Sequence, residues 1–202
     1  SKGVCATMNL SFSRGDDPEA VMENYRRIGE VLGVAPDHMA ASRQTHTTNI
    51  HLVTETDLGN GITRPSAYEE IDGLATDQPG IALVTYYADC VPLYFVDPVH
   101  QAIGLAHSGW RGTVSRMGEH MVQFMQEQFQ SRPEDLVAAI GPSICVDCYE
   151  VSEEVAEQFR GDFPENLLKK GKMPGKYQLD LWEANRSILL KAGILPEHLA
   201  MT

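Results

Sequence analysis

Three apolar runs follow one another closely in the middle of the chain, at residues 82–87, 91–96 and 102–106. Each run has the length and the β-branched or aromatic content of a buried strand. The Asp97-Pro98 pair predicts a turn between the second and third runs, because aspartate followed by proline favours a chain reversal. If these strands pair with one another, the residues at their ends are brought together.

Polar residues stand at the ends of these runs. Asp89 and Cys90 fall in the short break after the first run, and His107 follows the third. If the runs are neighbouring strands, the Cys90 thiol and the His107 imidazole meet at one edge of a sheet. The glycine-rich Ser-Gly-Trp-Arg-Gly after His107 opens a helix, and irregular backbone at the ends of rigid strands is where functional residues concentrate.

Three of the predicted helices are long and have clear boundary signals. The first begins at the Asp-Pro pair 17–18, an acidic cap followed by proline, and ends at Gly33. The second covers 114–129 and has an apolar side rich in methionine. The third follows the capping residue Asp180 and covers 181–191.

Further strands are predicted at 47–53 and 136–140, with an edge strand inside 1–14, and the Gly-, Pro- and Lys-rich stretch 163–176 is predicted as a flexible connection. Strands and helices mix without a strict alternation, because three strands precede the long helix. The chain is therefore predicted to be α+β, with a layered mixed β-sheet core flanked by helices. Residues 1–202 are expected to form a single catalytic domain.

The composition argues against several kinds of partner. A net charge of −12 disfavours nucleic acid and anionic membrane surfaces, and no apolar stretch is long enough to span a bilayer. We expect a cytoplasmic protein with reduced thiols, because the chain is neither short nor recognisably secreted. Cys145 and Cys148 form a lone CxxC, for which a structural role is favoured over a zinc or redox site.

Cys90 and His107 support two functional interpretations. Joined by another histidine they would hold zinc, and three protein ligands with an open fourth position define a catalytic zinc. Alternatively, Cys90 is a nucleophile and His107 its base, with the ring oriented by one of Asp89, Asp72 and Asn49. A buried thiol beside a hydrogen-bonded core histidine is the structural alternative. The residue types alone leave these alternatives open.

Four blocks of sequence indicate a family: QTHTTNIHLV, DGLATDQPGIALVTYYADCVPLYFVDP, AIGLAHSGWRGTV and AAIGPSICVDCYEV, in this order. They resemble the signature blocks of the bacterial laccase-domain or polyphenol-oxidase-like family. That family has been reinterpreted as purine nucleoside phosphorylases with adenosine deaminase activity, and its fold relatives include Cys–His toxins. The family's aromatic-Thr-Arg run and its C-terminal arginine-rich block have no counterpart here. The chain is therefore expected to lack the family's extreme N- and C-terminal segments.

The resemblance implies a single metal site, usually zinc, with His46, Cys90 and His107 as ligands. Copper is the alternative ion, from the family's oxidase description. A multicopper oxidase needs about ten histidine ligands over several centres, however, and this chain has seven histidines in all, so the laccase description fits the chemistry poorly.

The resemblance also implies a purine nucleoside and phosphate as substrates, with adenosine, inosine, guanosine and methylthioadenosine unranked. Arg111 is expected to bind phosphate, because a guanidinium binds phosphate bidentately. A salt bridge from Arg111 to Asp89 or Asp72 is the equally weighted alternative. Gln44 and Asp72 are expected to line the substrate site. Asp89 is expected to move protons during deamination, for which the zinc activates water.

Two other classes of protein remain as alternatives. A cysteine hydrolase or amidase would use Cys90 and His107 without metal, and a zinc-stabilised interaction module would have no activity. The older family description adds a copper-dependent polyphenol oxidase.

Overall fold

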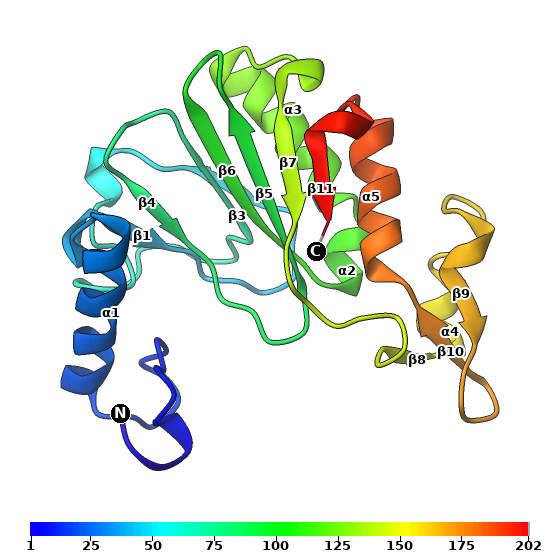
Figure 1. Ribbon diagram of the computed structural model, residues 1–202, viewed down its shortest axis with the longest axis horizontal. Helices are drawn as coiled ribbons and strands as arrows, with labels where there is room; N and C mark the ends of the chain where they lie inside the picture. The colour runs from blue at the N-terminus through cyan, green and yellow to red at the C-terminus, as the bar shows by residue number, and fades with distance from the viewer. Residues whose placement is uncertain (202) are drawn as a thin grey trace.

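A six-stranded mixed β-sheet forms the centre of the computed structural model, which describes residues 1–201 (Figure 1). Its strands lie in the order β11-β7-β5-β6-β3-β2. In that order their bounds are Leu199–Met201, Val137–Ile140, Val91–Asp97, Ala102–Ser108, Gly73–Thr76 and Ile50–Leu52. The central pairs are antiparallel, whereas β11 pairs with β7 and β2 with β3 in parallel. The prediction of a mixed sheet in an α+β fold is confirmed.

The central hairpin of β5 and β6 sets the position of the predicted site. Its register pairs Pro92 with His107 and Asp97 with Ala102. The Asp97 side chain closes the turn by accepting hydrogen bonds from the two backbone N–H groups that follow Pro98, at 2.8 and 3.0 Å. Because Cys90 directly precedes β5, the register brings it to the sheet edge where His107 lies. The predicted neighbouring strands are thus confirmed for the second and third apolar runs.

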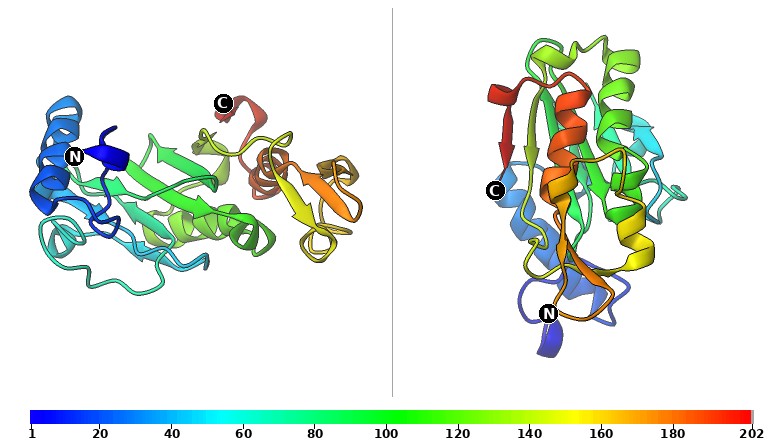
Figure 2. Two further views of the ribbon diagram at one scale, coloured as in Figure 1. Left: turned by 90° about the horizontal axis from the view of Figure 1, so that it is seen from below. Right: turned by 90° about the vertical axis from the view of Figure 1, so that its right-hand side faces the viewer.

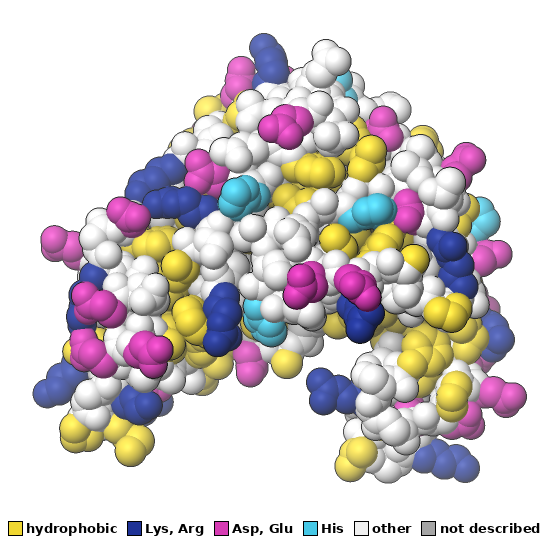
Figure 3. Space-filling model, turned by 180° about the vertical axis from the view of Figure 1, so that it is seen from behind, with side chains coloured by type: hydrophobic (Ala, Val, Ile, Leu, Met, Phe, Trp, Pro, Cys, Tyr) yellow, Lys and Arg dark blue, Asp and Glu magenta, His cyan; other side chains and the backbone are white. Residues whose placement is uncertain are grey.

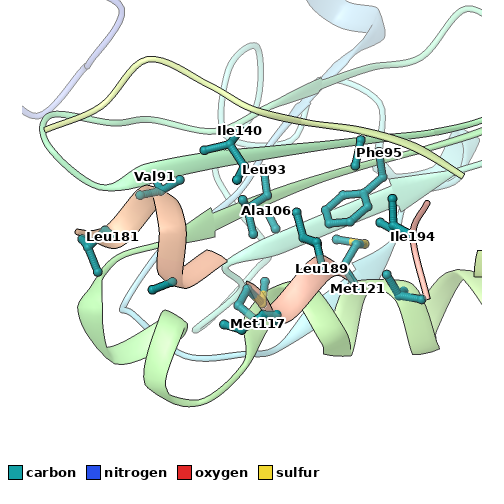
Figure 4. Close-up of a cluster of buried hydrophobic side chains, with 14 of the residues drawn as sticks. Val91, Leu93, Phe95, Ala106, Met117, Met121, Ile140, Leu181, Leu189 and Ile194 are labelled. Carbon is teal, nitrogen blue, oxygen red and sulfur yellow. The ribbon is translucent and has the colours of Figure 1, made fainter. Parts of the chain in front are cut away.

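Three helices cover one face of this sheet. They are α2, α3 and α5, with bounds Trp110–Val114, Met117–Phe129 and Leu181–Lys191. Figure 4 shows Leu93 and Phe95 of β5 pointing toward the methionines of α3 and toward Leu189 of α5. Tyr94 and Val96, which alternate with them, stay 43% and 45% exposed. This is the alternation of a strand that is buried on one face only.

Two smaller units lie at opposite ends of the central sheet (Figure 2). At one end α1 packs near the parallel pair β1–β4, and at the other α4 accompanies the three-stranded sheet β8-β10-β9. At the first end, α1 covers Pro18–Leu32, β1 covers Met39–Ala41 and β4 covers Ala82–Val84. At the other end, α4 covers Glu153–Glu157, β8 covers Glu150–Ser152, β10 covers Lys176–Leu179 and β9 covers Leu168–Lys170. Figure 3 shows the deep notch between the two projections from behind.

The first apolar run, 82–87, is not a third strand of the central sheet. Only Ala82–Val84 form a strand, half-buried and paired with β1 in a separate sheet. Beyond it, Tyr86 donates its N–H to the side-chain oxygen of Gln44 at 2.7 Å, and its C=O accepts from the Gln44 amide nitrogen at 2.7 Å. The strand ends here because a side chain, instead of another strand, satisfies the backbone.

The predicted helix over 114–129 is two helices. Arg116 separates α2 from α3 with a φ of 59°, in the left-handed region that ends a helix. The bend lets Met117 and Met121 of α3 pack fully buried against the sheet. The methionine stripe was read correctly, but a break at a non-glycine residue left no signal in the sequence.

Two peripheral predictions are also wrong, and one strand was missed. Residues 1–14 contain a 3₁₀-helix at Gly3–Cys5 and turns instead of an edge strand. The stretch 163–176 is ordered into the 3₁₀-helix Glu165–Leu167 and strand β9, because Leu167 is buried in the core. The last residues, for which no element was predicted, add β11 to the sheet.

The helix ends that the sequence marked are confirmed. Asp17 caps α1 by accepting from the Glu19 N–H, Gly33 ends it at a φ of 71°, and Asp180 caps α5 through the Glu183 N–H. Further 3₁₀-helices occur at Pro36–His38, Glu55–Asp57, Pro133–Asp135 and Pro196–His198. Within residues 1–201, none of the helices combines the length and the apolar character needed to cross a bilayer.

Candidate metal site

His46, Cys90 and His107 converge at the edge of the central sheet. Each offers one ligand atom, and these three atoms all lie within 4.8 Å of one another. The Cys90 Sγ and the Nε2 of His46 are 3.9 Å apart, and the two imidazole rings lie 4.9 Å apart between centroids. The three residues come from the loop after β1, the loop before β5 and the end of β6. The fold itself therefore assembles the group that the family resemblance implied.

The surroundings of this group fit a bound metal ion. A thiolate and two imidazoles are the donors that zinc prefers, and three protein donors leave a fourth position open. The lack of a side chain at Gly109 leaves space for Cys90 and His46, because a Cβ added there would lie 2.8 Å from the Cys90 Sγ and 3.1 Å from the His46 Cδ2. His46 is exposed, Cys90 half-buried and His107 buried, so the group lies at the surface with one ligand fixed in the interior.

A buried carboxylate lies behind His107. The Asp72 side chain is fully buried, and its Oδ1 lies 2.8 Å from the His107 Nδ1. Burial alone would raise the pKa of Asp72, but hydrogen bonds from His107, Thr45 and Thr47 lower it to about 2. Burial alone would lower the pKa of His107, but the Asp72 hydrogen bond and the neighbouring Cys90 sulfur raise it to about 9. With Nδ1–H donating to Asp72, Nε2 is the nitrogen that would bind a metal ion, once its own proton has left.

Asp72 also fixes the loop that carries His46. Its two oxygens accept the backbone N–H groups of Thr45, His46 and Thr47 at 2.9, 3.0 and 2.9 Å, and Oδ2 also accepts the Thr47 hydroxyl at 2.9 Å. His46 has a φ of 67°, a conformation that the carboxylate helps to stabilise. Asp72 was expected to line the substrate site, but the structure places it beneath the two histidines, without exposed surface.

A cavity of about 910 Å³ adjoins the candidate ligands. Its walls are residues 8–14, Gln44, Gly61, residues 85–90 and the two site histidines. Gln44, which was predicted to line the substrate site, is on this wall, and its amide group is hydrogen-bonded to the backbone of Tyr86. Asp89 is exposed on the wall beside Cys90, and its C=O accepts the Ile144 N–H at 3.0 Å.

Arg111 lies apart from this cavity. Its guanidinium stacks over the ring of Trp110, 4.4 Å from the centroid, and it does not line the cavity wall. Among the residues described, no ion pair within 4.0 Å joins Arg111 to Asp89 or Asp72, so the expected salt bridge is absent. Trp110 packs against the hydrophobic core.

Several residues of the site were missed in the sequence. Tyr87 lines the cavity, its ring lies 5.7 Å from that of His107, and its hydroxyl donates to the Ala106 C=O at 3.2 Å. Its position in a block of the family next to Ala-Asp-Cys was the available signal. Residues 8–14 gave none, since only tertiary packing brings them to the cavity.

The remaining cysteines and histidines lie elsewhere. Cys145 and Cys148 form a turn in which the Cys148 N–H donates to the Cys145 C=O at 3.1 Å, and neither belongs to the metal-ligand group. His51 and His100 pair with Asp57 and Asp97 at 3.1 and 2.8 Å.

The fold and this donor set together are suited to a mononuclear metal site with an open coordination position. The family described as "Multi-copper polyphenol oxidoreductase laccase" matches residues 1–202, and the chain belongs to this family. The resemblance inferred from the four sequence blocks is thereby confirmed.

Two curated relatives carry enzyme names. The purine nucleoside phosphorylase YlmD of Geobacillus stearothermophilus is 41% identical over 202 residues, covering 98% of this chain and 74% of that protein. Adenosine deaminase RL5, from an unknown prokaryotic organism, is 36% identical over 190 residues, covering 93% of this chain and 72% of that protein. The crystal structure of YlmD from G. stearothermophilus superposes with a TM-score of 0.93 at 39% identity, covering 100% of this chain and 76% of that one. The chain thus spans about three quarters of the length of these relatives. Their names, together with this similarity in sequence and structure, support an enzyme.

Proposed function

We propose that residues 1–202 are the single catalytic domain of a zinc-dependent purine nucleoside phosphorylase that also deaminates adenosine. The observation that carries the proposal is the convergence of His46, Cys90 and His107 beside a cavity of about 910 Å³. The names of the relatives supply the reaction. Zinc is the ion to which the proposal commits, because one thiolate and two imidazoles with an open fourth position form a catalytic zinc site.

Each residue of the site has a role in this proposal. His46, Cys90 and His107 hold the ion, which when bound supplies Lewis acidity and lowers the pKa of water to about 7. Asp72 holds both histidines in place from below. Asp89, which lines the cavity beside Cys90, carries a proton to or from the substrate.

The cavity binds the nucleoside and brings it to one of two nucleophiles. In phosphorolysis a phosphate oxygen forms a bond to C1′ of the ribose, the bond from C1′ to N9 breaks, and the purine leaves with that electron pair and takes up a proton. In deamination the oxygen of water adds to C6 of adenosine, and the amino group leaves as ammonia after gaining a proton. Proximity and orientation in the cavity favour both reactions.

A second candidate function is favoured by one specific contact. Asp72, His107 and Cys90 are arranged in space as in a Cys–His–Asp hydrolase, with the carboxylate at Nδ1 of the ring and the thiol next to the ring. Such a hydrolase or amidase would work after complete removal of metal, whereas the proposed phosphorylase would not.

The proposal is tested by incubating the zinc-loaded protein with inosine and phosphate. We expect hypoxanthine and ribose 1-phosphate in equal amounts, and inosine with ammonia when adenosine is supplied without phosphate. Failure to form either pair of products with zinc bound would reject the proposed function.

A further inference from the structure

The proposed reaction needs a cation for phosphate, and the cavity offers a single arginine or lysine. Of the side chains that line the cavity, only Arg14 carries a permanent positive charge. Arg111, the residue expected from the sequence, is stacked on Trp110 away from the cavity wall. A guanidinium is the group that binds a phosphate oxygen pair bidentately, so Arg14 has the right chemistry in the right place.

Arg14 is also uncommitted. Within residues 1–201 every other arginine has a partner. Six pair with carboxylates: Arg26, Arg27, Arg116, Arg132, Arg160 and Arg186. Arg43 and Arg64 donate to backbone carbonyls, and Arg111 stacks on a ring. Arg14 has no such contact, so binding an anion would break no existing interaction.

Two hydroxyl groups accompany it on the same wall. Ser11 and Ser13 line the cavity, and their Oγ atoms lie 3.1 Å apart. Hydroxyl groups donate to phosphate oxygens that a guanidinium does not reach. The stretch 11–14 thus presents one cation and two hydroxyls to the cavity.

The wall that carries these groups is fixed to α1. The buried Asn24 donates to the Asn9 C=O at 2.8 Å, and the Tyr25 hydroxyl donates to the Leu10 C=O at 2.9 Å. The ring of Phe12 stacks on that of Tyr25 with centroids 5.8 Å apart. Figure 1 shows this N-terminal segment, in dark blue, beside α1. The backbone is therefore positioned by packing while the Arg14 side chain stays free.

We propose that Arg14, with the hydroxyls of Ser11 and Ser13, forms the subsite that binds the phosphate co-substrate. The inference rests on the proposed function and adds the place of the second substrate. The carboxylate of Asp89 repels a phosphate anion from its own part of the wall and so favours the part formed by residues 11–14. The same chemistry could recognise the 5′-phosphate of a nucleotide, and inorganic phosphate is the ligand to which we commit.

Deamination supplies the internal control, because it consumes water and no phosphate. In the zinc-loaded protein, Arg14→Ala is expected to raise the KM for phosphate about 10- to 100-fold, the loss expected for a charge-assisted hydrogen-bonded contact. Adenosine deamination, zinc content and the KM for inosine stay within about twofold. Arg14→Lys recovers part of the phosphate affinity, and Arg26→Ala, which removes the same charge from the exposed face of α1, changes nothing.

Calorimetric titration of each zinc-loaded variant with inorganic phosphate tests the subsite without catalysis. We expect weaker binding in Arg14→Ala than in Arg26→Ala. An unchanged KM for phosphate and unchanged phosphate binding in Arg14→Ala would overturn the inference. Weaker phosphate binding in Arg111→Ala but not in Arg14→Ala would also overturn it. So would an Arg14→Ala variant that binds inosine 5′-monophosphate more weakly but inorganic phosphate as well as the wild type does. Absence of phosphorolysis in the wild-type protein, with Arg14-dependent phosphate binding intact, would reject the proposed function and leave the subsite standing.

Discussion

The Oδ1 of Asp72 lies 2.8 Å from the Nδ1 of His107, with both side chains buried. This contact fixes the orientation and tautomer of the ring, and the same carboxylate holds the backbone of the His46 loop. One buried side chain thus positions two of the three candidate ligands. Mutation of such a supporting residue typically costs about 10- to 100-fold in metal affinity or activity.

Asp72→Asn is predicted to weaken zinc binding about 10- to 100-fold. An asparagine has one acceptor oxygen, so its amide nitrogen would face backbone N–H groups that need an acceptor. Competition for zinc with a chromophoric chelator measures the change. Asp57→Asn, which alters another Asp–His pair remote from the ligands, is the matched control and should keep the wild-type affinity. Equal affinities in all three proteins would show that Asp72 has no part in metal binding.

Gly109→Ala is predicted to weaken metal binding while the chain stays folded. The new methyl group would lie 2.8 Å from the Cys90 Sγ, closer than real contacts allow, and it would push the sulfur out of place. Zinc content after dialysis, with circular dichroism for folding, is the measurement. Gly112→Ala is the control, because its Cβ would meet its nearest neighbour at an ordinary 3.5 Å. Loss of zinc from both variants alike would contradict the explanation.

Asp97→Asn is predicted to lower stability in a pH-dependent way. Burial alone would raise the pKa of Asp97, but the Ser131 hydroxyl, the backbone N–H groups of Val99 and His100 and the His100 ring hold it at about 2. Since the folded pKa lies below the unfolded value of about 4, the charge stabilises the fold above pH 4. That contribution is lost as the pH falls through 2.

The expected size of this effect is about 2 kcal/mol at pH 7. Urea unfolding of wild type and variant between pH 7 and pH 3 measures it, and the gap between them should narrow toward the acid end. A gap that stays constant over this range would mean that the Asp97 charge does not stabilise the turn.

The sequence predicted those parts of the fold and site that depend on contiguous signals. The apolar runs on either side of Asp97-Pro98 predict the β5–β6 hairpin, and that hairpin alone brings Cys90 to His107. The Asp17 and Asp180 caps predict where α1 and α5 begin. In each case the residues that determine the structure lie close together in the sequence.

What the sequence did not predict depends on distant partners. The Tyr86 backbone binds the Gln44 side chain, which ends β4 early. The three residues of β11 have no strand signal of their own and extend the sheet only because β7 offers a free edge. Asp72 was recognised as polar, but its position beneath both histidines follows from the pairing of β3 with β6. Residues 8–14 reach the cavity only through their anchorage on α1.

Zinc content and inosine phosphorolysis, measured together on wild type and His46→Ala, test the central claim most directly. His51→Ala, which removes a histidine that pairs with Asp57 instead of facing Cys90, is the control. We predict one zinc ion per chain with phosphorolysis in wild type and in His51→Ala, and the loss of both in His46→Ala. Full activity in a metal-free His46→Ala protein would contradict the account, because Cys90 and His107 would then be working without an ion.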